Sequence, residues 1–309
     1  MIQTVLGEIS KDELGIVIPH EHILVGFIED GKMTRDDYDR GEVIRIMLPY
    51  LMQLAAAGCR TLTECTPEFF GRAPYLLAEL SELSGLHIIT NTGYYQKPYL
   101  APFVYETSSE DLARIWIKEA LEGIESSGIK PGFIKIALSN TNGGISPVQQ
   151  TILKAALLTS RETGLPIQAH TIGGETVMHA LEFLARDNFE PSRFIWVHAD
   201  SEPDLTYHKK AALAGMWIEI DSIGYRPFEE HYAMLEKLIG MGLLNRLLIS
   251  QDAGWYCVGE KNGGNIKPFT TILEGFVPFL REKGIAQSII EQLMIANPAN
   301  ALENRKDRL

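Results

Sequence analysis

The sequence predicts an α/β protein of the (β/α)8, or TIM, barrel class. Three observations predict it: the chain has 309 residues, eight short apolar runs alternate with eight amphipathic stretches, and no change of composition divides the chain. A doubly wound open sheet is the competing interpretation, because it also alternates strands with helices. The length and the count of eight favour the barrel, in one domain over residues 1–309.

The predicted strands are short runs of mainly apolar residues. They cover residues 15–19, 60–64, 86–91, 132–137, 166–169, 194–197, 216–220 and 246–250. Between them, apolar residues recur at the i, i+3, i+4 spacing of a helix that buries one face. These spacings predict helices over residues 42–57, 73–84, 108–126, 146–163, 175–186, 204–214, 227–241 and 270–283. Residues 287–309 are predicted to form an additional helix that closes the barrel, followed by a charged end.

Composition and charge exclude several classes of protein. Lys and Arg total 28 against 40 Asp and Glu, and the net charge of −12 opposes binding to nucleic acid or to an anionic membrane surface. No apolar run approaches the ~20 residues that span a bilayer, and the N-terminal residues lack the pattern of a signal peptide. Three cysteines without a Cys-x-x-Cys pair argue against a disulfide framework. We therefore expect a cytoplasmic protein.

Polar side chains follow the first predicted strand, at the end where a barrel places its chemistry. Residues 19–22 read Pro-His-Glu-His. His20 and His22 are two positions apart, so an extended chain directs both to one side and Glu21 to the other. Two imidazoles on one face form a metal-ligand arrangement, and a surface loop with two histidines is the ordinary alternative.

Three further strand ends carry residues of the same kind, namely His170, His198 and Asp252. Each has an ordinary interpretation by itself, as a capping or core histidine or as a turn aspartate. A barrel brings the ends of strands one, five, six and eight to one mouth, so their joint occurrence predicts a single site. Asp200, two residues beyond His198, is expected to orient a metal-ligating side chain without itself binding the metal ion.

Lys135 lies inside the apolar run of the fourth predicted strand. Burial of an ammonium group is costly, so a buried lysine is neutralised, paired or modified. One interpretation is an ion pair between Lys135 and an acidic residue across the barrel. The other is carboxylation by carbon dioxide, which gives an anionic carbamate able to bridge two metal ions. Spacing alone does not decide between them.

These segments together resemble the phosphotriesterase family of the amidohydrolase superfamily, including the phosphotriesterase-like lactonases. The resemblance runs through the whole chain. It includes Gly-x-x-x-Pro-His-Glu-His-Ile at 15–23, Phe-Ile-Lys-Ile at 133–136, Pro-Ile-Gln-Ala-His-Thr at 166–171, Pro-Ser-Arg-Phe-Ile-Trp-Val-His-Ala-Asp at 191–200 and Leu-Ile-Ser-Gln-Asp-Ala-Gly at 248–254. Residues 295–302, Ile-Ala-Asn-Pro-Ala-Asn-Ala-Leu, resemble the closing helix of that family.

The resemblance implies a hydrolase with two divalent metal ions. His20, His22 and Asp252 would hold the more buried ion, and His170 and His198 the more exposed one. Carboxylated Lys135 (N6-carboxylysine) and a hydroxide would bridge the two ions. Zn²⁺ is the first expectation, and Mn²⁺, Co²⁺ or Fe²⁺ suit the same donors. In this scheme the hydroxide attacks the substrate, and Asp252 passes a proton to the leaving group.

The loops after the strands are expected to select the substrate. Related lactonases carry an aromatic residue near Tyr94 and Tyr95. Several relatives place an arginine close to the position of Ser222, and the nearest arginine in this chain is Arg226. Residues 254–267, which include Trp255, are predicted to form a lid. The predicted substrate contacts are therefore Tyr94, Tyr95, Arg226 and Trp255.

Three functions fit these residues. The first is a hydrolase that opens a lactone or cleaves a related carboxylic ester, with phosphotriester cleavage as a side activity and a slight preference for small polar lactones. The second is an amidohydrolase that cleaves the C–N bond of a cyclic amide. The third is a metal-binding homologue with little catalysis, against which the presence of Asp252 argues. The expected partners are a small-molecule substrate and, from the resemblance, a second copy in a homodimer.

Overall fold

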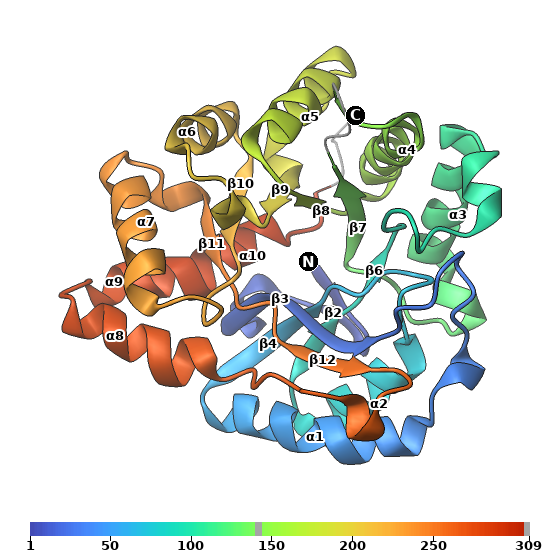
Figure 1. Cartoon of the computed structure of the whole chain (residues 1–309), viewed down its shortest axis with the longest axis horizontal. Coiled ribbons are helices and arrows are strands. Elements are labelled where there is room, and N and C mark those ends of the chain that lie inside the picture. Colours follow the sequence, from blue (N-terminus) through green and yellow to red (C-terminus); the bar gives the residue numbers. More distant parts are fainter. Residues whose placement is uncertain (140–143, 306–309) are drawn as a thin grey trace.

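The computed structural model describes residues 1–139 and 144–305, and it forms a (β/α)8 barrel (Figure 1). Parallel strands lie at the centre and helices surround them. Six strands follow the order β11-β10-β9-β8-β7-β6, and four follow the order β12-β3-β4-β5. One residue, Thr90, separates β5 from β6, so the two form a single broken third strand that joins both sets. The predicted fold class is confirmed.

The strands lie close to their predicted positions. They are β3 (Ile16–Val25), β4 (Cys59–Glu64), β5 (His87–Ile89), β6 (Asn91–Thr92), β7 (Phe133–Leu138), β8 (Ile167–Thr171), β9 (Phe194–Val197), β10 (Trp217–Ile220) and β11 (Leu247–Ile249). The first of these is longer than predicted, because the His-Glu-His segment continues the strand. The parallel register of β7 and β8 sets Lys135 opposite Gln168 and Ala137 opposite His170.

The eighth strand closes onto the first through an extension that was not predicted. Four residues after β11, the chain continues as β12 (Gly254–Cys257), which pairs with β3 in parallel. Between them, the His22 N–H donates to the Ala253 carbonyl at 2.9 Å, and the Asp252 N–H donates to the His20 carbonyl at 3.2 Å. The prediction of a lid over residues 254–267 is therefore wrong for its first four residues, which complete the barrel wall.

The predicted helices are present, with two differences. They are α1 (Arg40–Ala56), α2 (Pro74–Ser84), α3 (Ser109–Glu122), α4 (Pro147–Thr163), α5 (Gly174–Arg186), α6 (Leu205–Ala214), α7 (Phe228–Gly240) and α8 (Val277–Glu282). Gly123 has φ 104° and ends α3 early. A π-helical segment, Thr271–Phe276, precedes α8, because Pro278 has no amide hydrogen to continue α-helical bonding. None of the helices in the described residues is long and apolar enough to cross a membrane.

The N-terminal end of the barrel is filled and covered. Val17, Ile89 and Phe133 form an apolar cluster there with Ile2 and Leu302. Ile2 belongs to a hairpin of β1 (Ile2–Thr4) and β2 (Gly7–Ile9) that was not predicted, and Leu302 follows the closing helices α9 (Gln287–Glu291) and α10 (Asn297–Ala301). Part of the predicted charged end, residues 306–309, lies outside the described residues. A substrate must therefore enter at the opposite end.

Candidate active site

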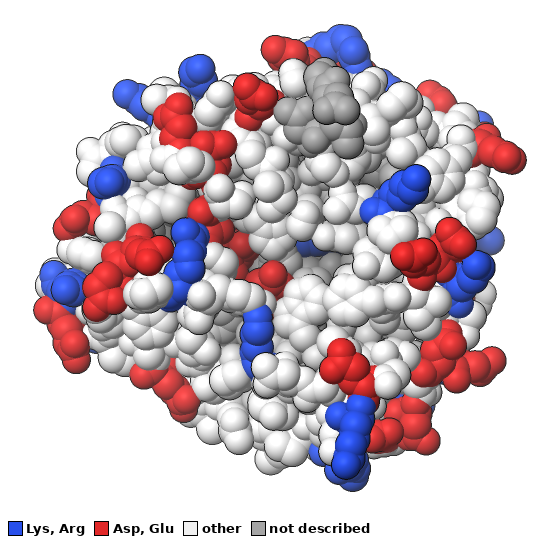
Figure 2. Space-filling view, in the orientation of Figure 1, with Lys and Arg blue, Asp and Glu red and all other residues white. Residues whose placement is uncertain are grey.

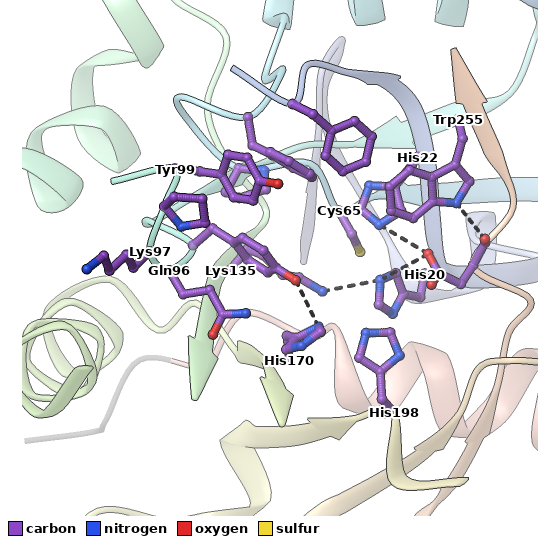
Figure 3. Close-up of a pocket in the computed structure, with 16 residues that line it drawn as sticks. His20, His22, Cys65, Gln96, Lys97, Tyr99, Lys135, His170, His198 and Trp255 are labelled. Atoms are coloured by element: carbon purple, nitrogen blue, oxygen red, sulfur yellow. Dashed lines mark hydrogen bonds and ion pairs between the residues drawn. The ribbon is translucent and has the colours of Figure 1, made fainter. Parts of the chain in front are cut away.

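A cavity of about 330 Å³ opens at the carboxyl ends of the strands, and all six predicted metal ligands line it (Figure 3). The ligands come from β3, β7, β8, the end of β9 and the segment between β11 and β12: His20, His22, Lys135, His170, His198 and Asp252. Figure 2 shows a hollow at the centre of this face, with most charged side chains around the periphery. The structure thus brings together residues that lie far apart in the chain.

β3 presents His20 and His22 to the cavity and Glu21 to the barrel wall. The two imidazole centroids are 5.3 Å apart, and their Nε2 atoms lie 3.8 Å (His20) and 3.2 Å (His22) from Asp252 Oδ1. On the other side of the strand, the Glu21 carboxylate accepts hydrogen bonds from Ser250 Oγ at 3.0 Å and from the Ala253 N–H at 2.6 Å. Glu21 therefore fixes the segment that carries Asp252, a role not predicted from the sequence.

For His20, His22 and Asp252, the environment favours the protonation states that bind a metal ion. Burial lowers the pKa of His20 to about 3 and also lowers the pKa of His22, so both imidazoles are neutral. Burial alone would raise the pKa of Asp252, but the surrounding imidazoles bring it below its ordinary value. Neutral imidazole and ionised carboxylate are the forms that ligate metals.

Asp221, directly after β10, contacts the Nδ1 atoms of two of the histidines through its carboxylate. Its Oδ2 lies 3.0 Å from His20 Nδ1, and its Oδ1 lies 2.8 Å from His198 Nδ1. Its Oδ2 also accepts a hydrogen bond from the His198 backbone N–H at 2.9 Å. Burial would lower the pKa of His198, but the Asp221 carboxylate raises it. A carboxylate on Nδ1 fixes the ring and leaves Nε2 for a ligand.

His170 and His198 form the other side of the cavity, with their ring centroids 4.4 Å apart. The phenol oxygen of Tyr95 lies 3.2 Å from His170 Nδ1 and fixes that ring. His198 and Asp252 have left-handed backbone conformations, with φ of 63° and 48°. Such conformations cost about 1–3 kcal/mol in residues other than glycine and cluster at functional sites. Here each one turns the chain abruptly at a strand end.

Lys135 reaches the cavity from inside the barrel and is only 2% exposed. Its Nζ lies 3.3 Å from His20 Nε2. Within residues 1–139 and 144–305, no carboxylate oxygen lies within 4.0 Å of this Nζ, so the ion pair considered above is not formed there. Gly93, with φ 110°, packs directly against the Lys135 backbone, where a Cβ would lie 2.2 Å from the carbonyl oxygen. Among the described residues, the amine therefore lies next to an imidazole and has no carboxylate within ion-pair distance.

The donor set fits a divalent cation. The ligand atoms of His20, His22 and Asp252 lie within 4.8 Å of one another. Asp252 Oδ1 is buried and accepts no hydrogen bond within the described part of the chain. A buried carboxylate oxygen without a partner is costly, and a cation between it and the imidazoles would remove that cost. Imidazole nitrogen and carboxylate oxygen suit Zn²⁺ as well as Mn²⁺, Co²⁺ and Fe²⁺.

Similarity to known proteins identifies the family of this chain. A sequence model described as the Phosphotriesterase family matches residues 1–302. The chain belongs to the phosphotriesterase family. Within it, a phosphotriesterase homology protein of Escherichia coli (strain K12) is 28% identical, over 94% of this chain and 98% of its own length. An aryldialkylphosphatase of Saccharolobus solfataricus is 24% identical, over 94% and 95% respectively.

A solved structure agrees with this membership across the whole fold. A variant of a PTE-like lactonase from Deinococcus radiodurans superposes on this chain with a TM-score of 0.88 at 29% identity. The superposition covers 98% of this chain and 100% of that one. The fold match therefore agrees with the family match.

Of the four predicted substrate contacts, Tyr95 and Trp255 line the cavity, and Tyr94 does not. The Trp255 ring lies 4.4 Å from the His22 ring, and its indole N–H donates to the Asp252 carbonyl at 2.7 Å. Tyr94 is only 1% exposed, and its ring packs 5.2 Å from that of Trp116 in the core. Because neighbouring residues of an extended segment point to opposite sides, only one of the two tyrosines reaches the cavity.

Arg226, the fourth predicted contact, lies in a separate hollow on the surface. Its Nη2 donates to the carbonyl oxygen of Asp200 at 3.1 Å and to Asp200 Oδ2 at 3.3 Å. Asp200 also accepts a hydrogen bond from Ser222, and within the described residues it bonds to none of the predicted metal ligands. The prediction that Asp200 orients a ligand is wrong, and Asp221 has that role. The sequence could have indicated this role, because Asp221 directly follows the predicted strand 216–220.

We expect Asp221→Asn to lower the affinity for metal roughly 10- to 100-fold. An asparagine would keep one acceptor oxygen but direct an N–H group at the second histidine Nδ1, so one of the two rings would lose its orientation. Metal titration of the purified variant measures this effect. Asp200→Asn is the matched control, because Asp200 is also a buried carboxylate but, among the residues that the structure describes, hydrogen-bonds to none of the predicted metal ligands. Equal metal affinity in the two variants would contradict the role of Asp221.

Proposed function

We propose that this protein is a metal-dependent hydrolase that opens a lactone or cleaves a related carboxylic ester. His20, His22 and Asp252 would hold one divalent ion, His170 and His198 a second, and carboxylated Lys135 would bridge them. Zn²⁺ is the first candidate for both positions. The observation that carries the proposal is Asp252 Oδ1, which accepts no hydrogen bond within the described residues and lies 3.8 and 3.2 Å from the Nε2 atoms of two neutral imidazoles.

When bound, the cations supply two effects: they polarise the carbonyl oxygen of the substrate, and they make water nucleophilic at neutral pH. Asp252 accepts the proton as the water oxygen bonds to the carbonyl carbon. The ester C–O bond then breaks, and Asp252 returns the proton to the departing alkoxide oxygen, which yields a hydroxy acid from a lactone. Trp255 and Tyr225 both donate to the Asp252 backbone carbonyl, at 2.7 and 2.8 Å, and fix the backbone from which this side chain projects.

The size and the walls of the cavity support a small ring as substrate. Its volume of about 330 Å³ is near the lower end of the ~300–1,000 Å³ typical of ligand sites. Aromatic rings form one wall: Phe70 stacks on Tyr95 with centroids 5.3 Å apart, and Phe27 stacks on Trp255 at 6.2 Å. A flat lactone ring can pack against such faces. The aryldialkylphosphatase relative supports phosphotriester cleavage as a side activity.

Removal of metal is expected to reduce lactone hydrolysis to the uncatalysed rate, because the side chains supply a proton acceptor but no strong electrophile. Chelator-treated enzyme is assayed before and after addition of Zn²⁺, Mn²⁺, Co²⁺ or Fe²⁺. The metal-replete enzyme is then compared on γ-lactones, aryl carboxylic esters, cyclic amides and phosphotriesters. The proposal requires the highest kcat/KM on a lactone or carboxylic ester. Preference for the amide would identify C–N hydrolysis instead, and no turnover at all would indicate a metal-binding homologue.

A further inference from the structure

Gln96 lines the same cavity but has no role in the proposed reaction (Figure 3). It follows Tyr95 in the loop after β6 and is half-buried. Its amide oxygen accepts hydrogen bonds from Ser139 Oγ at 2.6 Å and from Gln149 Nε2 at 3.4 Å. Gln149 Nε2 also donates to Ser139 Oγ at 2.9 Å, so these three side chains form a closed group.

The start of α4 fixes the direction of this group. Gln149 forms a capping box with Ser146, whose N–H and Oγ donate to Gln149 Oε1 at 3.3 and 2.9 Å. Gln149 must therefore direct its Nε2 toward Gln96. A reversed Gln96 amide would set two N–H₂ donors against each other, which is unfavourable. The orientation of the Gln96 amide thus follows from a helix cap on another element.

This orientation leaves the Gln96 amide nitrogen as a free donor. Gln96 Nε2 has no acceptor within residues 1–139 and 144–305, and Gln96 lines the cavity together with His170 (Figure 3). Phe27 and Phe70 line the cavity without a donor group, and the Trp255 N–H is used by Asp252, whereas Lys97 and Tyr99 also line the cavity and carry donor groups.

We propose that Gln96 is a specificity-determining residue, whose Nε2 donates a hydrogen bond to an oxygen that the substrate carries outside the ester being cleaved. The inference rests on the proposed hydrolase function and narrows its substrate to lactones with such an oxygen substituent. A site that is built to bond a substrate oxygen disfavours an analogue without it, because the donor then loses water without gaining a partner. Gln149 is a positioning residue in this arrangement.

The test compares α-hydroxy-γ-butyrolactone with α-methyl-γ-butyrolactone, two substrates of nearly equal size, on the metal-replete enzyme. The measured quantity is the kcat/KM for the hydroxy lactone divided by the kcat/KM for the methyl lactone. The intrinsic reactivity of each lactone is the same for every variant, so it cancels when variants are compared. We expect Gln96→Met to lower this ratio by roughly five- to tenfold, the usual effect of one neutral hydrogen bond. The loss should occur mainly in KM for the hydroxy lactone.

A second variant leaves Gln96 itself unchanged. Gln149→Glu retains the capping box, for which glutamate is well suited, but it places a carboxylate at a buried position, so a thermal melt is needed to check that the fold is kept. The second carboxylate oxygen of the introduced glutamate would attract the Gln96 N–H₂ and reverse the Gln96 amide. We therefore expect the ratio of kcat/KM values to fall as much as in Gln96→Met. Gln150→Glu adds the same charge one position later, on an exposed residue whose side chain, within the described residues, bonds to the Ile145 carbonyl, and serves as the matched control.

The possible outcomes separate this inference from the function on which it rests. A lower ratio in Gln96→Met and Gln149→Glu, with the parent ratio in Gln150→Glu, supports it. If the parent and all three variants hydrolyse both lactones with the same ratio of kcat/KM values, the role of Gln96 is overturned and the hydrolase function is left intact. Turnover of neither lactone by the metal-replete parent overturns the function and this inference together.

Discussion

Replacement of Asp252 by asparagine is expected to lower kcat roughly 100- to 10,000-fold while the metal content stays largely intact. Asparagine has the size of aspartate and keeps one oxygen near His20 and His22. Its amide does not accept a proton at neutral pH, so the transfer from water to the leaving alkoxide is lost. Metal analysis and lactone turnover of the same preparation measure the two properties together.

Asp204→Asn is the control for this variant. Asp204 is the exposed N-cap of α6, where its side chain accepts a hydrogen bond from the Thr206 N–H, and asparagine caps helices equally well. Its turnover should equal that of the parent. Hydrolysis at the parent rate by Asp252→Asn would show that another group accepts the proton. Loss of metal in step with activity would show that the carboxylate acts only as a ligand.

The part of this site that follows from regular structure could be predicted from the sequence. His20 and His22 point to one side because a strand repeats every two residues, and the strand ends meet because the barrel closes. Lys135 could be singled out because a charge within an apolar strand needs a special environment. These predictions required only local periodicity and the topology of the fold.

The part that depends on irregular backbone and on distant partners could not be predicted. The positive φ values of His198 and Asp252 decide where these side chains point, and no repeat in the sequence specifies them. The choice of Asp221 over Asp200 depends on which carboxylate faces the histidines. The orientation of Gln96 depends on Gln149, which lies 53 residues later on another helix.

Lys135→Ala is expected to lose both bound metal and activity. The Lys135 side chain lines the cavity, 3.3 Å from His20 Nε2, and no carboxylate oxygen in the described residues lies within 4.0 Å of its Nζ. As an ammonium group it would repel a divalent cation. As a carbamate, formed when the amine nitrogen bonds to the carbon of carbon dioxide and releases a proton, it would attract one. Alanine removes that anionic ligand and leaves a space at the floor.

That space permits a chemical rescue. Acetate or propionate in solution can enter it and present a carboxylate in place of the carbamate, so partial recovery of metal and turnover is expected. Lys118→Ala removes an exposed lysine of α3 and should change neither property. If Lys135→Ala retained its full complement of metal, the lysine would not be a ligand. If metal were lost and no short carboxylate restored it, the lysine would support the site by packing, because an anionic ligand is replaceable by another anion of similar size.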